Sequence, residues 1–174
     1  MEIPFIDLKS QYELISEKIK GSIDVVLGHG NFINGPEVTE FETNLKSYTS
    51  VKHAITCANG TDALAIALLA LKIQPHDAVF VPSFTYIASA ESIALVGGVP
   101  YFVDVGEDYN ICSKSLEIAI DDAKKNNHNP RIVIPVDLFG KPSICGELDE
   151  LIDNFNLETI YDAAQSFGSS HNQI

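Results

Sequence analysis

Cysteines and basic residues are scarce in this sequence, and each scarcity excludes a class of protein. The three cysteines, Cys57, Cys112 and Cys145, are an odd number without a CxxC pair, which argues against a disulfide framework or a zinc site. They fit buried thiols in a reducing compartment, so we expect a cytoplasmic protein without a bound metal. Only 11 Lys and Arg oppose 24 Asp and Glu, for a net charge of −13. Neither a nucleic-acid partner nor an anionic membrane surface is therefore expected.

Long apolar runs and several well-known catalytic motifs are also missing. No run reaches the roughly 18 residues of a membrane span, and residues 1–8 lack the basic start and apolar core of a signal peptide. The sequence has no GxGxxG after a strand, no GxxxxGK[ST], no GxSxG and no HExxH. Hydride transfer, nucleotide hydrolysis and serine hydrolysis consequently lose support.

What the sequence does contain is a regular alternation of apolar segments. Its 174 residues are 45% hydrophobic, which is enough for a single domain with a real core. An amphipathic helix is expected over 10–27, with Ser10 and Glu13 as a capping box, and a second helix is expected to begin at Pro36. Five strands are expected after it, at 53–58, 78–81, 100–105, 131–136 and 159–162. Helices are expected between them over 60–71, after the loop 82–86 with an end at Gly97-Gly98, over 113–125 and over 148–155.

The near-continuous apolar character of these strands predicts an α/β fold, a three-layer arrangement in which helices cover both faces of a mostly parallel sheet. Ligands of such sheets gather beyond the carboxyl ends of the strands. The turn 59–62 falls at these ends, together with Phe84, Tyr86, Asp162 and Gln165. This set would suit a flat, phosphorylated heteroaromatic ring.

The turn at 59–62 is expected to bind an anion. A helix that begins here presents the N–H groups of Gly60, Thr61 and Asp62, and its dipole favours negative charge. Gly60 lets a phosphate approach the backbone, and Thr61 can add a hydroxyl. The alternative is an ordinary strand-to-helix turn with Thr61 as its N-cap.

Three stretches resemble the DegT/StrS-type sugar aminotransferases, which are pyridoxal 5'-phosphate (PLP) enzymes of fold type I. They are Asn-Gly-Thr-Asp-Ala-Leu at 59–64, Pro-Ser-Phe-Thr-Tyr at 82–86 and Asp-Ala-Ala-Gln-Ser-Phe-Gly at 162–168. Segments 5–8 and 35–37 match as well, so the resemblance covers essentially the whole chain. It implies N-terminal helices over about 1–50, followed by the PLP-binding large domain over about 51–174, incomplete at its C-terminus.

The resemblance also implies roles for individual residues. Gly60 and Thr61, with Asp62 in the same turn, would hold the phosphate of PLP. Tyr86 would stack on the pyridine ring, and Phe84 is the second candidate for that place. Two further roles fall in the segment 162–168.

Asp162 would keep the ring nitrogen protonated and so serve catalysis; the alternative is that it only caps its turn. Gln165 would lie beside the ring hydroxyl; the alternative is an ordinary surface glutamine.

One essential residue of the family has no counterpart here. The lysine that bonds covalently to the cofactor follows the Asp-Ala-Ala-Gln block in the family, whereas this chain stops at Ile174 and neither Lys72 nor Lys141 matches the motif. The C-terminal domain that completes the homodimer is missing too. The resemblance therefore implies the N-terminal part of a longer enzyme, and this part would be inactive by itself. In the sheet of that enzyme, strand 53–58 would lie at the far edge, away from the other strands of this chain.

For the complete enzyme the resemblance implies transfer of an amino group from glutamate to a ketosugar nucleotide in polysaccharide or lipopolysaccharide biosynthesis. The nearest enzymes act on a UDP-linked 3-keto sugar acid. Two other interpretations stay open. One is a non-catalytic remnant that binds a phosphorylated ligand or a partner chain, and the other is a doubly wound nucleotide-binding module unrelated to PLP.

Overall fold

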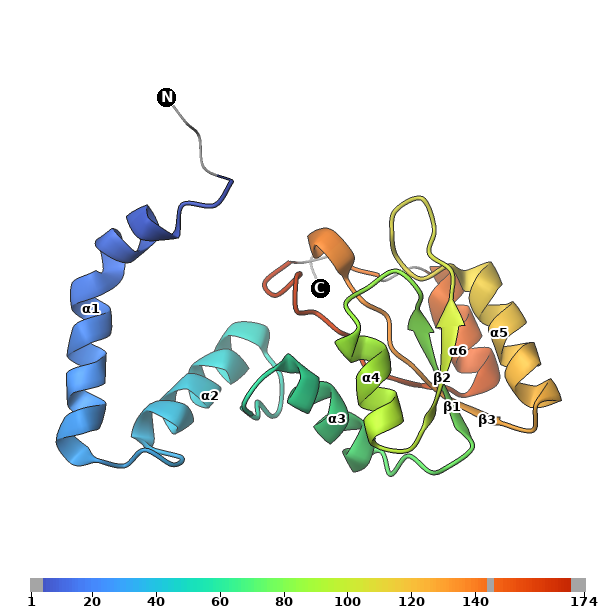
Figure 1. Ribbon diagram of the computed structural model, residues 1–174, viewed down its shortest axis with the longest axis horizontal. Helices are drawn as coiled ribbons and strands as arrows, with labels where there is room; N and C mark the ends of the chain where they lie inside the picture. Colours follow the sequence, from blue (N-terminus) through green and yellow to red (C-terminus); the bar gives the residue numbers. More distant parts are fainter. Residues whose placement is uncertain (1–4, 144–145, 170–174) are drawn as a thin grey trace. The chain divides into compact units, whose positions relative to one another are not determined.

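The computed structural model describes residues 5–143 and 146–169. The chain divides into two compact units, Met1–Thr56 and Cys57–Ile174, which are described separately below. Figure 1 colours the first unit blue to cyan and the second from green to red. Within the described residues, no helix combines the length and the apolar character needed to cross a bilayer.

The first unit consists of helices α1 (Leu8–His29) and α2 (Pro36–Thr49). The carboxylate of Asp7 caps α1 because it accepts hydrogen bonds from the Ser10 N–H (3.0 Å) and hydroxyl (2.7 Å). Asp is among the best N-cap residues, so the helix begins earlier than expected and the predicted capping box of Ser10 and Glu13 is wrong. The expectation that Pro36 opens the second helix is confirmed, since the first turn needs no N–H from it.

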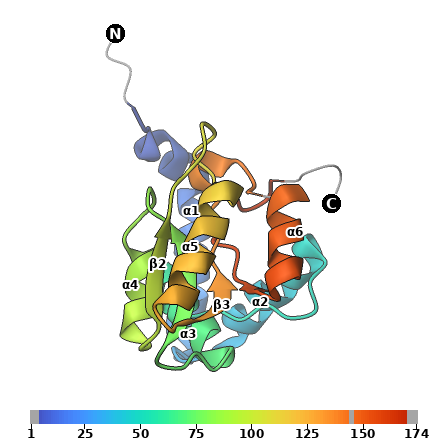
Figure 2. The ribbon, with the colours of Figure 1, turned by 90° about the vertical axis from the view of Figure 1, so that its right-hand side faces the viewer.

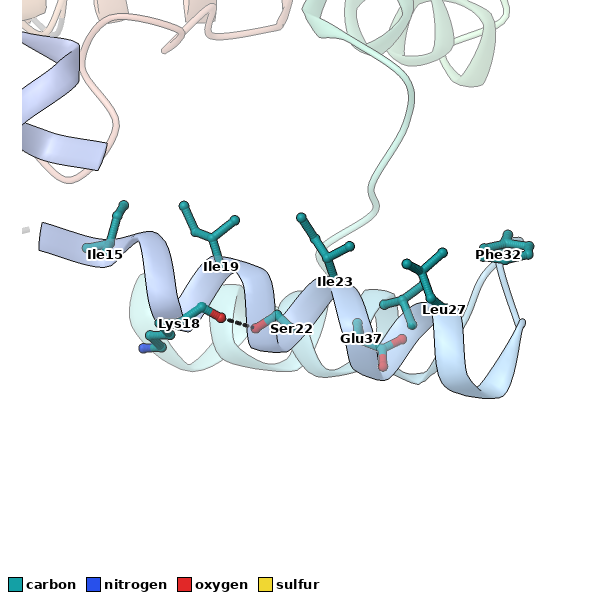
Figure 3. Close-up of a pocket in the computed structure, with 9 residues that line it drawn as sticks. Ile15, Lys18, Ile19, Ser22, Ile23, Leu27, Phe32 and Glu37 are labelled. Carbon is teal, nitrogen blue, oxygen red and sulfur yellow. Dashed lines mark hydrogen bonds between the residues drawn. The ribbon is translucent and has the colours of Figure 1, made fainter. Parts of the chain in front are cut away.

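Apolar side chains form a stripe along α1, as its amphipathic sequence predicts. Figure 3 shows Ile15, Ile19, Ile23 and Leu27 projecting in the same direction at four-residue intervals. Together with Phe32 they line a hollow of about 680 Å³, at whose border lie the polar side chains of Lys18 and Glu37. Spacing of four residues places side chains on one helical face, which explains the stripe.

Residues 53–58 form no strand, so the expectation of five strands is wrong at this point. An alternating sequence becomes a strand only when a neighbour pairs with its backbone, and none does so in the described part of the chain. Ile55 is 82% exposed, and Thr56 instead donates from N–H and hydroxyl to the Glu42 carboxylate, both at 2.9 Å. The backbone N–H of Thr56 is the main cause that lowers the pKa of Glu42.

The cysteines differ partly from the expectation of buried thiols. Cys57 is exposed, and its thiol donates to the Asn59 carbonyl at 3.2 Å. Cys112 is partly buried. The prediction for Cys145 lies outside the described residues.

The second unit is built on a four-stranded parallel sheet with the order β2-β1-β3-β4. Its helices lie where the sequence predicts them, within two or three residues at the ends. The elements in chain order are α3 (Gly60–Ala70), β1 (Asp77–Pro82), α4 (Ala88–Leu95), β2 (Val99–Val103), α5 (Ser113–Lys125), β3 (Asn129–Val133), the short 3₁₀ helix η1 (Leu138–Gly140), α6 (Gly146–Phe155) and β4 (Glu158–Thr159).

Two apolar cores lie on opposite faces of this sheet and confirm the three-layer expectation. Ala78 and Phe80 of β1 pack in the core formed with α5 and α6, whereas Val79 and Val81 pack in the core formed with α3 and α4. All six residues of β1 are buried, as a central parallel strand requires. Figures 1 and 2 show α4 on one side of β1 and β2 and α5 on the other.

Two neighbouring leucines of α3 test the contribution of the second core. Leu68 is fully buried, while Leu69 is 59% exposed. We expect Leu68→Ala to lower the free energy of unfolding by about 2–5 kcal/mol, because it leaves a cavity beneath the sheet. Leu69→Ala makes the same change on the same helix and should stay within about 0.5 kcal/mol. Urea unfolding measures both, and equal losses would contradict this packing.

Candidate active site

A pocket of about 190 Å³ lies in the second unit at the carboxyl edge of the sheet. The start of α3, the loop after β1, the segment after β3 and the segment after β4 each contribute to it. The lining residues are Gly60, Thr61, Leu64, Thr85, Tyr86, Ala88, Val136, Leu138, Asp162, Ala164 and Gln165. The structure thus brings together five of the seven residues predicted for the site, and leaves out Asp62 and Phe84.

The start of α3 supplies two backbone donors to this pocket, one fewer than expected. Asn59 is the N-cap: its side-chain oxygen accepts from the Asp62 N–H at 2.9 Å, and its amide group donates to the Asp62 carboxylate at 3.1 Å. The Asp62 N–H is therefore occupied, and Thr61 is not the cap. The N–H groups of Gly60 and Thr61, which have no partner earlier in the helix, remain for a ligand.

Gly60 also leaves its surroundings open. A side-chain carbon at this position would meet no atom within 4 Å. No neighbouring atom therefore requires a glycine at this position, which agrees with a backbone left open to a ligand.

The two aromatic candidates have different surroundings. Tyr86 lines the pocket and is 74% exposed. Phe84 lies instead against the ring of Tyr109, with 5.8 Å between ring centroids, and Tyr109 meets Phe139 edge-on at 5.4 Å. Only Tyr86 is therefore placed to cover a ring bound in the pocket.

The carboxylate of Asp162 is held by two hydrogen bonds. It accepts from the hydroxyl of Ser89, a buried residue of α4, at 3.1 Å and from the Ala164 N–H at 3.3 Å. The bond to Ala164 is the turn-capping interaction that the sequence left open as an alternative. Because Asp162 also lines the pocket, capping its turn and facing a ligand are compatible.

Gln165 is oriented by the turn that follows Asp137. Its side-chain oxygen accepts from the Phe139 N–H at 2.6 Å, which leaves its NH₂ group as the donor. Phe139 adopts a left-handed conformation with φ 58°. Gly140 follows with φ 85°, and a side-chain carbon there would lie 3.2 Å from the Gln165 carbonyl. The turn can approach Gln165 closely because Gly140 has no side chain.

Sequence reasoning missed Asp137, which lies next to the site. This buried side chain accepts hydrogen bonds from Ser143 and Ser166 at 2.6–2.8 Å. A signal was present in the sequence, since Asp137 follows one predicted strand just as Asp162 ends the next one. Its serine partners are separated along the chain and could not be identified from spacing.

A second pair of loops is joined by an ion pair outside the pocket. Lys141 Nζ lies 2.8 Å from the Asp108 carboxylate, and neither side chain lines the pocket. The hydrogen bond from Lys141 is the main cause that lowers the pKa of Asp108.

The lowered pKa of Asp108 has a consequence for stability at acidic pH. The ion pair contributes fully above the ordinary carboxyl pKa of 3.8, and its contribution is lost as the pH falls through the lower pKa of the folded state. We expect Lys141→Met to return the Asp108 pKa towards 3.8, as measured by NMR titration. Lys125→Met removes the same charge from the exposed end of α5 and should leave this pKa unchanged. A pKa unaffected by Lys141→Met would contradict the ion pair.

The donor set of the pocket fits a phosphorylated pyridine ring: two backbone amides and a hydroxyl at a helix start for the phosphate, an aromatic side chain for the ring and a carboxylate for a ring nitrogen. The mostly parallel sheet with helices on both faces is the fold of the type-I PLP enzymes among the solved structures described below. Residues 13–173 match the DegT/DnrJ/EryC1/StrS aminotransferase family, and the chain belongs to this family. Its members depend on PLP.

Two relatives illustrate the family relationship. The chain is 44% identical over 170 residues to the UDP-2-acetamido-2-deoxy-3-oxo-D-glucuronate aminotransferase of Pseudomonas aeruginosa, covering 97% of this chain and 46% of that protein. It is 36% identical over 169 residues to the dTDP-3-amino-3,4,6-trideoxy-alpha-D-glucose transaminase of Streptomyces venezuelae, covering 97% of this chain and 43% of that protein. The chain therefore spans about half the length of the curated relatives it matches.

Solved structures agree with this assignment. A DegT/DnrJ/EryC1/StrS aminotransferase from Brucella abortus superposes with a TM-score of 0.91 at 45% identity, over 96% of this chain and 45% of that one. A Bacillus subtilis protein crystallised with the bound cofactor PMP superposes with a TM-score of 0.87 at 30% identity, over 97% of this chain and 38% of that one. The predicted fold class and family are confirmed.

Proposed function

We propose that this chain forms the cofactor-binding part of a PLP-dependent aminotransferase that acts on nucleotide sugars. The observation that carries the proposal is the convergence of the Gly60 and Thr61 amides, the Tyr86 ring and the Asp162 carboxylate on one pocket. The anion site at the start of α3 matches a phosphate group, and the carboxylate of Asp162, after β4, matches a protonatable ring nitrogen. A phosphorylated heteroaromatic base carries both groups. A simple anion-binding remnant would have no need for the carboxylate.

Each residue then has a distinct task. The amides of Gly60 and Thr61, with the Thr61 hydroxyl, bind the phosphate, and Tyr86 covers the ring. Asp162 keeps a proton on the ring nitrogen, and the Gln165 NH₂ group donates to the ring oxygen. When bound, PLP supplies an electron sink for the carbon that loses or gains the amino group. Asp62 and Phe84 support the site from outside, Asp62 through Asn59 and Phe84 through Tyr109.

For the substrates, we propose glutamate as the amino donor and a UDP-linked 3-keto sugar as the acceptor, within polysaccharide or lipopolysaccharide biosynthesis. The identity of 44% with the Pseudomonas aeruginosa enzyme supports this choice. We further propose a cytoplasmic homodimer for the protein at its natural length. Assays of amino transfer from glutamate to UDP- and dTDP-linked ketosugars test the proposal, and turnover of dTDP sugars alone would overturn the UDP assignment.

Two substitutions separate catalysis from cofactor binding in the protein at its natural length. Asp162→Asn should lower kcat by on the order of 10²-fold while the Kd for PLP changes little, because it removes a charge that acts in the transition state. Thr61→Ala should do the reverse and raise the Kd for PLP with a smaller effect on kcat. Steady-state kinetics and PLP titration measure both effects.

A matched control removes the same charge elsewhere. Asp153 is an exposed carboxylate on α6, so Asp153→Asn should leave kcat and Kd unchanged. Near-normal turnover of Asp162→Asn would show that another group holds the ring nitrogen.

Residues 1–174 by themselves should transfer no amino group. No lysine is among the residues that line the pocket in the described part of the chain, so we expect this polypeptide to hold PLP non-covalently. Borohydride reduction followed by mass spectrometry should give no stoichiometric label on a single lysine, whereas the protein at its natural length should be labelled. Specific labelling of the 174-residue polypeptide, together with turnover, would contradict this expectation. Binding of phosphorylated ligands without labelling or turnover at natural length would favour the non-catalytic interpretation.

A further inference from the structure

Asp137 is a buried carboxylate that the proposed chemistry does not use. It is 7% exposed and is not among the residues that line the pocket. One oxygen accepts from the Ser143 N–H (2.8 Å) and hydroxyl (2.6 Å), and the other accepts from the Ser166 hydroxyl (2.6 Å). A buried carboxylate needs such donors, but their arrangement also connects two segments that lie far apart in the sequence.

The segment 137–139 is attached to the turn 162–166 at three places. The Asp137 N–H donates to the Asp162 carbonyl at 3.1 Å, and the Asp137 carboxylate binds Ser166 four residues further on. Between these two points, the Phe139 N–H donates to the Gln165 side chain at 2.6 Å. Both ends of the turn, and the Gln165 side chain beside its second end, are thus held by the segment 137–139.

We propose that the hydrogen bond between Asp137 and Ser166 positions Asp162 and Gln165 for the cofactor. Asp137 is a positioning residue, which acts through the turn and touches neither cofactor nor substrate. This inference rests on the proposed function, because the turn matters only if its two polar side chains contact PLP. Ser143 shares the same carboxylate but lies on another segment, so its hydroxyl contributes to local stability alone.

The two serines provide a matched pair of variants in the protein at its natural length. Ser166→Ala and Ser143→Ala each remove one hydroxyl from the same buried carboxylate. Both should lower the thermal midpoint by similar amounts. Ser166→Ala alone should raise the Kd for PLP about fivefold, as expected for one lost hydrogen bond, and should shift the absorption maximum of the bound cofactor. Ser143→Ala should retain the Kd and the spectrum of the unaltered protein.

A second comparison keeps the inference testable if a serine variant is too unstable. In Asp137→Asn the side-chain oxygen can still accept from Ser143. The new NH₂ group can donate to the oxygen of the Ser166 hydroxyl, because a hydroxyl can accept a hydrogen bond as well as donate one. Asp137→Ala loses all of these bonds. We therefore expect Asp137→Ala to raise the Kd for PLP several times more than Asp137→Asn does.

The outcomes distinguish this inference from the proposed function. If the unaltered protein does not bind PLP, the proposed function fails and the positioning role fails with it. If the unaltered protein binds PLP but the two serine variants have equal Kd values and identical spectra, the positioning role alone is overturned. Equal effects of Asp137→Asn and Asp137→Ala would also overturn it.

Discussion

Parallel pairing of β3 with both β1 and β4 is the constraint on which the site depends. Parallel strands end at the same edge of a sheet, so the loops that follow them meet there although they are far apart in the sequence. The pocket draws on the segments after β1, β3 and β4 and on the start of α3, from Gly60 to Gln165. A register shift between β1 and β3 would displace Leu138 and Asp162 relative to Tyr86.

The pocket combines two electrostatic features of opposite sign. Two free amides at the start of α3 favour an anion, and the Asp162 carboxylate favours a cation or a proton. Neither feature is rare by itself, because helix starts and strand-end carboxylates occur in many α/β proteins. Their presence in one small pocket, beside an aromatic ring, favours a ligand that carries an anionic group and a protonatable atom.

The sequence was sufficient to predict the helices, four of the strands and the set of strand-end residues, because these follow from the spacing of apolar residues along the chain. It was not sufficient for 53–58, since alternation does not reveal whether a neighbouring strand is present. Caps were a second weakness. Asp7 and Asn59 are capping residues whose competitors, Ser10 and Thr61, are equally suitable chemically, and only the backbone geometry decides between them.

Three-dimensional contacts also decided what spacing had left open. Phe84 and Tyr86 are alternate residues of one loop, and the sequence could not say which faces the pocket. The ring of Phe84 packs against the ring of Tyr109, which lies in the loop after β2. Tyr86, in contrast, lines the pocket. The partners of Asp137 were equally inaccessible, because Ser143 and Ser166 come close to it only after the strand ends meet.

The fixed orientation of the Gln165 amide gives the pocket a means of rejecting ligands. A free glutamine can turn its oxygen or its nitrogen toward a ligand and so accepts either partner. Here the oxygen is engaged by Phe139, and only the NH₂ group remains. A ring that presents an oxygen acceptor at this point gains a hydrogen bond, whereas a ring that presents an N–H would place two donors against each other, at a cost of about 1–3 kcal/mol for unpaired buried groups. Discrimination between otherwise similar heterocycles can thus originate in the left-handed turn at Phe139, which lies outside the pocket.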